Sequence, residues 1–333
     1  MLEQVRSSLD AAKSFFFPPA RISQVGASRF YFYNHAASGR ESINRLSLMT
    51  EPAIRNHAKL PIRCDNKLAD KILNQLCQDG VAIFPIDQIS DGSKIFERLN
   101  SEWATNENMV KDQVREWRRS LSEESDSANA KYGAKEYIFS FAPRASYGSP
   151  HWQLALHPDV LYIINSYMYA YAKIYHIDYL LNIPTQDLAA KKSQVWHRDG
   201  DGTVLKLFVY LSDVSAKHGP FTYAPGTHSG ALRKINYKSG KRPQTDSELR
   251  ELLGGYEREF VPCVGQKGTV VIANTSGMHK GGHVLEGERK VLVIAYYPPW
   301  IDRSDYGLSF PNDLPLGLHP AQLAALSRTS NDA

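Results

Sequence analysis

The strongest constraint on the fold is a series of short apolar runs in the C-terminal half of the chain. Each run is rich in β-branched and aromatic residues, and clusters of glycine, proline and aspartate separate them. The runs are 203–211, 220–223, 259–263, 268–273 and 289–297. Because no helical crossovers lie between most of them, the pattern predicts antiparallel strands in a barrel or sandwich.

The N-terminal half favours helices. One helix is predicted from Asp65, as its N-cap, to about Gln78, and Gly80 would end it. Its apolar stripe would consist of Leu68, Ile72, Leu73 and Leu76.

Further elements follow along the chain. Residues 81–86 (VAIFPI) predict a buried strand, and 93–104 and 107–119 predict two helices. Pro158 at a first helical position predicts another helix, which would run to about Tyr175.

The predicted fold class is α+β, with helices packed on one face of a double sheet. Residues 61–305 would form the main domain, with an insertion at 229–258 that becomes helical around 246–253. Residues 1–60 form an N-terminal extension without strong periodicity, and 306–333 form a C-terminal tail.

Composition limits the function classes. A net charge of +4 over 333 residues is too weak to argue for nucleic-acid binding without a concentrated patch. Three scattered cysteines speak against a disulfide framework and favour a reducing compartment. The first residues lack the apolar core of a signal peptide, and no run of about 18 apolar residues could span a membrane. We therefore expect a cytoplasmic protein, whose oligomeric state the sequence leaves open.

A histidine and an aspartate two residues apart carry the pattern that points to chemistry. In a strand, His197 and Asp199 share one face, so their side chains can converge. An imidazole and a carboxylate, joined by a second histidine from a distant strand, form the facial triad that holds Fe(II) and leaves three positions open. His279 is the candidate, because a short turn connects it to the run 268–273, and His283 is its rival.

Arg289 is a candidate anion-binding residue. It would open the strand after this turn and share a face with Val291 and Val293. Burying a guanidinium without a partner is very costly, so this side chain needs an anion, and a bidentate carboxylate is its natural partner. Lys206, inside the first apolar run, is either a second active-site cation or an outward-facing lysine on a solvated face.

These residues, taken in order, resemble the phytanoyl-CoA dioxygenase family of iron- and 2-oxoglutarate-dependent oxygenases. The matching segments are D-G-V at 79–81, W-H-x-D at 196–199, Y-L-S-D at 210–213, H-G-P-F at 218–221 and P-G-T-H at 225–228, followed by His279 and Arg289. The resemblance covers roughly residues 65–300 and leaves the N-terminal extension outside it.

The resemblance implies a double-stranded β-helix, a jelly-roll or cupin-like barrel, with flanking N-terminal helices. It places Fe(II) at one open end of the barrel, held by His197, Asp199 and His279, which would be the catalytic residues. Some relatives replace the acidic ligand to make room for a halide. The presence of Asp199 therefore favours hydroxylation over halogenation.

The resemblance also implies 2-oxoglutarate as cosubstrate, with O2 as the oxidant. Its C5 carboxylate would pair with Arg289. Apart from the resemblance, Lys206 is a further candidate for binding it, and Gln194, three residues before His197, either hydrogen-bonds the cosubstrate or substrate or forms a structural hydrogen bond. The expected reaction hydroxylates a C–H bond of a small molecule, such as a natural-product, lipid or sugar-linked intermediate. Two alternatives stay open: a cupin-like barrel that binds a metal or ligand without oxidation, and a hydroxylase of macromolecules.

The segment 233–242 contains five Lys or Arg residues and no acid. It is either a solvated loop or a docking surface for an anionic substrate, since insertions between barrel strands border the mouth of the barrel. A second basic stretch, with the same two interpretations, consists of Lys111, Arg115, Arg118 and Arg119.

Overall fold

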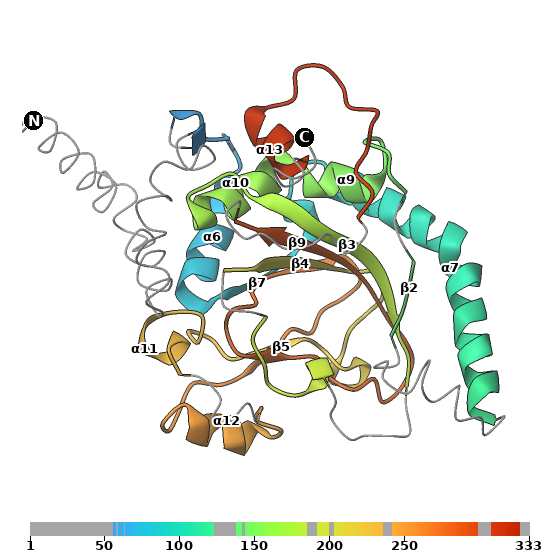
Figure 1. Cartoon of the computed structure of the whole chain (residues 1–333), viewed down its shortest axis with the longest axis vertical. Helices are drawn as coiled ribbons and strands as arrows, with labels where there is room; N and C mark the ends of the chain where they lie inside the picture. Colours follow the sequence, from blue (N-terminus) through green and yellow to red (C-terminus); the bar gives the residue numbers. More distant parts are fainter. Residues whose placement is uncertain are drawn as a thin grey trace, which may run out of the picture.

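Two antiparallel sheets form the centre of the protein, with helices stacked on the larger one (Figure 1). The computed structural model describes residues 56–57, 59–62, 64–122, 138–141, 144–184, 192–199, 203–235, 242–298 and 308–326. Within these ranges, no helix combines the length and the apolar character that crossing a membrane requires.

The larger sheet has six strands in the order β1-β7-β4-β9-β3-β2, and every neighbouring pair is antiparallel. Its strands are β1 (Val81–Pro85), β2 (Ile138–Phe141), β3 (Lys173–Asn182), β4 (Leu205–Tyr210), β7 (Thr269–Asn274) and β9 (Arg289–Tyr297). The smaller sheet has the order β6-β5-β8, with β5 (Thr222–Tyr223), β6 (Val261–Pro262) and β8 (His279–Lys280).

Helices cover one face of the larger sheet (Figure 1). They are α6 (Lys67–Asp79), α7 (Gly92–Ser122), α9 (Pro150–Ala155), α10 (Pro158–Met168) and α13 (Pro320–Leu326). Two short helices, α11 (Gly230–Arg233) and α12 (Asp246–Leu252), lie on the side of the smaller sheet. Short 3-10 turns occur at η1 (Ile86–Gln88), η2 (Lys192–Gln194) and η3 (Ala216–His218).

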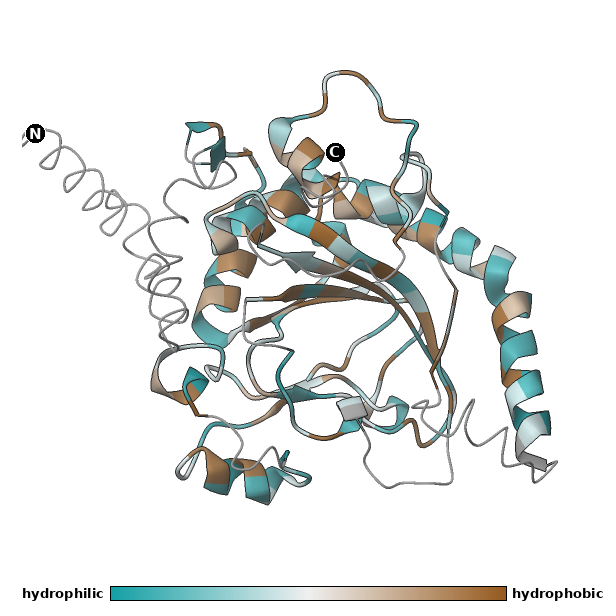
Figure 2. Ribbon diagram, in the orientation of Figure 1, coloured by the Kyte–Doolittle hydropathy of each residue, from teal (hydrophilic) through white to brown (hydrophobic). Residues whose placement is uncertain are grey.

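The two faces of the larger sheet have different partners because side chains alternate along a strand. Leu207 and Ile294 are paired neighbours on the outer face and join the core formed with the helices. Phe208 and Val293, one residue away on each strand, belong to a second cluster between the two sheets. In Figure 2, hydrophobic colour accordingly concentrates on the strands and on α10, whereas much of α7 is hydrophilic.

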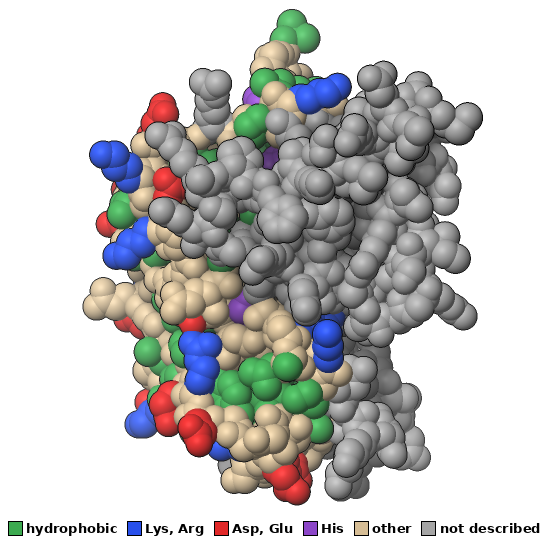
Figure 3. All heavy atoms as spheres, turned by 90° about the vertical axis from the view of Figure 1, so that its left-hand side faces the viewer, with side chains coloured by type: hydrophobic (Ala, Val, Ile, Leu, Met, Phe, Trp, Pro, Cys, Tyr) green, Lys and Arg blue, Asp and Glu red, His purple; other side chains and the backbone are tan. Residues whose placement is uncertain are grey.

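Charged side chains are mixed on the surface. On the described part of the face in Figure 3, Lys and Arg side chains lie among Asp and Glu side chains. An interspersed surface of this kind creates no extended field of one sign.

Five predicted strands are present, as β4, β5, β6, β7 and β9, and the strand predicted at 81–86 is β1. The prediction missed β2, β3 and β8. The helix predicted to reach Tyr175 ends at Met168, because Tyr169 adopts the left-handed conformation (φ 52°), and β3 begins at Lys173. The first residues of β3, 173–175, were therefore wrongly assigned to the end of that helix.

The two helices predicted at 93–104 and 107–119 are one continuous helix, α7. The polar residues between them do not interrupt it, because their side chains bond back to carbonyls four residues earlier. Thr105 Oγ1 donates to the Ser101 carbonyl at 2.9 Å, and Asn106 Nδ2 donates to the Glu102 carbonyl at 2.8 Å.

The N-terminus of α6 also differs from the prediction. Asn66, not Asp65, is its N-cap, and the Asn66 side chain accepts a hydrogen bond from the amide of Leu68 at 3.0 Å. Leu68 itself is exposed. The buried stripe keeps Ile72 and Leu76 of the predicted set and adds Ala69 and Cys77.

Gly80 ends α6 as predicted, in the left-handed conformation (φ 82°). Its lack of a side chain matters for a second reason. A Cβ at this position would lie 2.5 Å from the Tyr223 hydroxyl and 2.3 Å from Nδ1 of His228, both inside the protein. The position therefore excludes a side chain by backbone conformation and by close packing.

We expect Gly80→Ala to lower the free energy of unfolding by about 3 kcal/mol, combining left-handed strain and overpacking of roughly 1–2 kcal/mol each. Gly254→Ala is the matched control, because Gly254 has a similar φ of 72° and open space around it. Urea unfolding of both variants measures the difference. Equal losses would mean that Tyr223 and His228 move aside without cost.

Candidate metal centre

Three side chains converge at one end of the cleft between the sheets. His197, Asp199 and His279 each offer a ligand atom, and these atoms all lie within 4.8 Å of one another. Nε2 of His197 lies 3.6 Å from Oδ1 of Asp199, and Nε2 of His279 lies 3.7 Å from its Oδ2. The predicted triad is thus brought together, with both imidazoles buried and the carboxylate partly buried.

Backbone pairing places the two histidines side by side. The His197 amide donates to the His279 carbonyl at 2.9 Å, and the His279 amide donates to the His197 carbonyl at 3.0 Å. The Asp199 amide donates to the Thr275 carbonyl at 2.8 Å. The prediction of a regular strand over His197 and Asp199 is wrong, since His197 forms only an isolated bridge with His279.

Arg198, between two members of the triad, fixes this segment to its surroundings. Its guanidinium donates to the carbonyls of Thr227 and Ser276 at 2.7 Å and of Leu232 at 2.9 Å. Oγ1 of Thr227 in turn accepts from the amide of Met278, the residue before His279, at 2.7 Å. The P-G-T-H turn therefore serves to hold both histidine segments together.

The hydrogen bonds of the imidazoles define their tautomers. Nδ1 of His197 lies 2.8 Å from the Val195 carbonyl, and Nδ1 of His279 lies 3.0 Å from the Gly277 carbonyl. A carbonyl only accepts, so each Nδ1 carries the proton and each Nε2 presents its lone pair. Both Nε2 atoms face Asp199, which is the arrangement that a metal requires.

Electrostatics favour the same protonation states. Burial lowers the pKa of both His197 and His279, so that both imidazoles are neutral near pH 7. Burial opposes ionisation of Asp199, but the attraction of His279, Lys206 and His197 outweighs it and lowers the pKa of this carboxyl. Two neutral imidazoles and one carboxylate are ready to bind a divalent cation without releasing protons.

Lys206 lies on the inner face of β4, where its Nζ is 2.6 Å from Oδ2 of Asp199. The interpretation of Lys206 as an outward-facing lysine is therefore wrong. Its contact is with the carboxylate of the triad.

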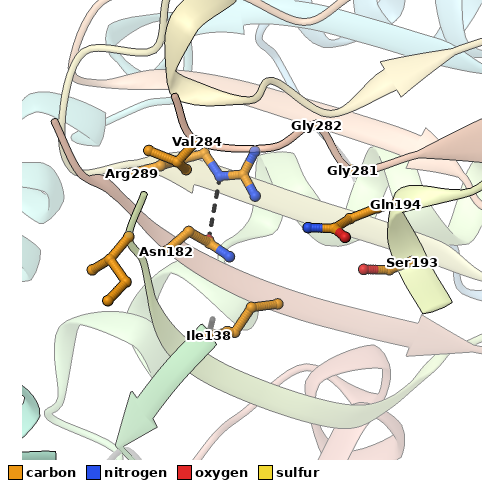
Figure 4. Close-up of a pocket in the computed structure, with 9 residues that line it drawn as sticks. Ile138, Asn182, Ser193, Gln194, Gly281, Gly282, Val284 and Arg289 are labelled. Atoms are coloured by element: carbon orange, nitrogen blue, oxygen red, sulfur yellow. Dashed lines mark hydrogen bonds between the residues drawn. The ribbon is translucent and has the colours of Figure 1, made fainter. Parts of the chain in front are cut away.

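Arg289 begins β9 and lines the same cavity, of about 140 Å³, as His197, His279 and Lys206. Its Nε donates to Oδ1 of Asn182 at 3.3 Å (Figure 4). Burial lowers the pKa of the guanidinium. In the part of the chain that the structure describes, no carboxylate forms an ion pair with this side chain.

Gln194 lies across from Arg289 in an adjoining pocket of about 20 Å³ (Figure 4). A pocket of this size has room for about one ordered water, since about 10–15 Å³ suffices for one. The main cavity is the larger space, and Gln194 lies at its border.

Other residues that the sequence singled out lie outside the triad. His228 is buried, with its Nε2 3.3 Å from the Cys77 carbonyl. Among the described residues, the metal-binding group contains His279 and not its rival His283. Sequence reasoning missed Asn182, the partner of Arg289, because it missed β3. The alternation of the segment 173–182 was the signal that could have found it.

Two imidazoles and one carboxylate beside a cavity are the donor set of non-haem iron enzymes. The family model described as phytanoyl-CoA dioxygenase (PhyH) matches residues 102–290, more than half of the chain. The chain belongs to the phytanoyl-CoA dioxygenase family. Iron and 2-oxoglutarate are accordingly its cofactors, and O2 is its co-substrate.

Solved structures of oxygenases resemble the chain distantly. The epimerase SnoN in complex with Fe3+, alpha ketoglutarate and nogalamycin RO is 16% identical, with a TM-score of 0.45 over 74% of this chain and 96% of that one. EctD from S. alaskensis with 2-oxoglutarate and 5-hydroxyectoine is 17% identical, with a TM-score of 0.47 over 78% and 86%. AviO1 from Streptomyces viridochromogenes Tue57 is 16% identical, with a TM-score of 0.44 over 73% and 100%. No curated protein matches the chain.

We expect His279→Ala to weaken Fe(II) binding by more than about a hundredfold, because loss of an outer-shell partner alone costs about 10–100-fold. His197→Ala and Asp199→Ala should do the same. His283→Ala is the matched control and should bind Fe(II) like the wild type. Anaerobic equilibrium dialysis measures all four variants. Loss of binding in His283→Ala with retention in His279→Ala would exchange their assignments.

Proposed function

We propose that the protein is a 2-oxoglutarate-dependent hydroxylase of small molecules, with Fe(II) held by His197, Asp199 and His279. Arg289 would bind the C5 carboxylate of 2-oxoglutarate. We further propose that the two sheets form a double-stranded β-helix, with this site between them. The observation that carries the functional proposal is the Arg289 guanidinium, which faces the triad's cavity without an anionic partner among the described residues.

The charge of the Arg289 guanidinium favours a bound anion. Arg289 is partly buried, and a cation that leaves water without a counter-ion is costly, so a bound carboxylate would lower that cost. Since Nε already donates to Asn182, the terminal nitrogens are left to bind a carboxylate through two parallel hydrogen bonds. A barrel that only binds a metal, which is the main alternative function, gives this guanidinium no role.

The donor set fits iron. One carboxylate and two imidazoles would hold the metal and would leave positions free for a 2-oxo acid and O2. When iron, 2-oxoglutarate and O2 are bound, they supply oxidative decarboxylation to succinate and transfer of an oxygen atom to a substrate C–H bond. Because both imidazoles are neutral and Asp199 is ionised, all three side chains are in the protonation state that binds a metal.

The wall between Arg289 and the triad is apolar. Leu180, Phe208, Val291 and Val293 line the cavity there. Such a wall suits the methylene carbons of 2-oxoglutarate.

Lys206 and Gln194 have supporting roles in this proposal. Lys206 would hold Oδ2 of Asp199, so that the carboxylate binds iron through its other oxygen alone. Gln194, at the border of the cavity, would hydrogen-bond the cosubstrate or the substrate.

Arg289→Ala should raise the 2-oxoglutarate concentration for half-maximal succinate release about a hundredfold, because a charge-assisted bidentate pair contributes a few kcal/mol. Fe(II) affinity should change little. Lys290→Ala is the matched control, since Lys290 is the next residue of β9 and pairs with Glu107 of α7 at 2.6 Å. An unchanged 2-oxoglutarate requirement in Arg289→Ala would contradict the anchor assignment.

We also propose that the substrate is anionic. The segment 233–242 supplies positive charge, although residues 236–241 lie outside the described residues. The positive charge of Arg242 contributes, after the larger effect of burial, to lowering the pKa of His197. The carbonyl of Pro243, the residue after Arg242, accepts from the amide of Trp196 at 3.1 Å, so the segment ends near the metal centre. Opposite charge at the mouth would raise the local concentration of an anion.

Neutralising Arg233, Lys234, Lys238, Lys241 and Arg242 should weaken substrate binding and reduce its salt dependence, because salt screens such attraction over about 10 Å at 0.1 M. Candidate acids are first screened by succinate release with the wild type. The control variant neutralises Lys111, Arg115, Arg118 and Arg119 on α7 and should behave like the wild type. Identical salt dependence in all three proteins would leave the segment as a solvated loop.

A further inference from the structure

One carboxylate outside the triad connects the two histidine-bearing segments. Trp196 precedes His197 in the chain, and Lys280 follows His279. Nε1 of Trp196 donates to Oδ1 of Asp246 at 2.9 Å, and Nζ of Lys280 donates to the same oxygen at 2.5 Å. Oδ1 of Asp246 therefore accepts hydrogen bonds from two residues that are adjacent in the chain to His197 and His279.

The Trp196 side chain is held from several sides. It is fully buried, and its ring lies 4.7 Å from the ring of Phe260. The ammonium nitrogen of Lys280 lies 4.7 Å from the centroid of the Trp196 ring, in a cation–π contact. The surrounding apolar cluster includes Leu249 of α12 and Met278, which directly precedes His279. Movement of Trp196 would therefore displace both histidine segments.

Asp246 itself has a defined position. It is the first residue of α12, and the N-cap Thr245 forms a reciprocal capping box with Glu248. The backbone nearby adds a further link, because the amide of Trp196 donates to the Pro243 carbonyl at 3.1 Å. The start of α12 is thus tied to the Trp196 segment by main chain and side chain.

We infer that Asp246 is a positioning residue, which sets the relative placement of the His197 and His279 imidazoles through Trp196 and Lys280. The inference rests on the proposed metal centre and adds to it a residue from the insertion 229–258. Metal affinity depends on how well the ligands are oriented before the ion arrives, and outer partners that orient them change it about 10–100-fold.

The alternative is that Asp246 only forms a surface ion pair. Its side chain is 54% exposed, and exposed pairs contribute little to stability. The two roles differ in what they affect. A surface pair would leave the geometry of a bound metal unchanged, whereas a positioning residue would alter it in a folded protein.

The test compares Asp246→Ala with Asp246→Asn, which keeps a side-chain oxygen as acceptor for Trp196. Glu251→Ala is the matched control, an exposed acid on the same helix. Co(II) is the probe, because its visible absorption reports both its affinity and its coordination geometry. Near-UV circular dichroism of the metal-free proteins shows whether they are folded.

We expect Asp246→Ala to bind Co(II) at least about tenfold more weakly, with a changed visible spectrum and a near-UV spectrum that still shows a folded protein. Asp246→Asn should recover most of the affinity, and Glu251→Ala should match the wild type. Wild-type affinity and spectrum in Asp246→Ala would overturn the inference and leave the metal centre intact. Absence of Co(II) binding by the wild type would instead contradict the metal centre, and the inference with it.

If Asp246→Ala lacks the near-UV spectrum of a folded protein, Trp196→Phe is the second variant that tests the inference. Phenylalanine keeps an aromatic ring in the same apolar site, and although it is smaller than tryptophan it lacks the N–H donor to Asp246. Weaker Co(II) binding by folded Trp196→Phe would support the inference. Wild-type binding by this variant would overturn it.

Discussion

The two faces of the six-stranded sheet pack against different partners, and the rest of the structure depends on this difference. The outer face is apolar and packs against the helices, as Leu207 and Ile294 do. That packing fixes the backbone, so the side chains that alternate with these residues are held in place on the inner face. Lys206 and Arg289 are two such side chains, and a rigid sheet allows charged groups to stay at defined positions in a cavity.

The triad is built differently. Its histidines lie on short segments, the two-residue strand β8 and an isolated bridge, which few ladder hydrogen bonds support. Side-chain hydrogen bonds hold these segments in place. Arg198 donates to three carbonyls, and Thr227 accepts from the amide of the residue before His279. Asp246 accepts from Trp196 and Lys280. One wall of the cavity is thus held by the larger sheet, whereas the triad at its end is held by individual polar contacts.

The sequence predicted what depends on local pattern and motif order. Strands β4, β7 and β9, the end of α6 at Gly80 and the convergence of the triad all followed from spacing and residue type. It could not predict features set by distant partners. The apolar residues of β3 suit a helix or a strand equally, and only pairing with β9 decides between them. The roles of Asn182 and Asp246 likewise appear only once the chain is folded, since each acts on a residue more than 30 positions away.

The Arg289 guanidinium, which forms no ion pair with a carboxylate among the described residues, has a thermodynamic consequence. Any small anion that enters and pairs with Arg289 binds the folded chain and not the unfolded one, so it must stabilise the fold by linkage. The gain is RT ln(1 + [L]/Kd), about 2.7 kcal/mol when the ligand is at 100 times its dissociation constant. Where the pool of such acids runs low, more of the protein would be unfolded and open to proteolysis. The abundance of the enzyme would then follow the supply of small carboxylic acids.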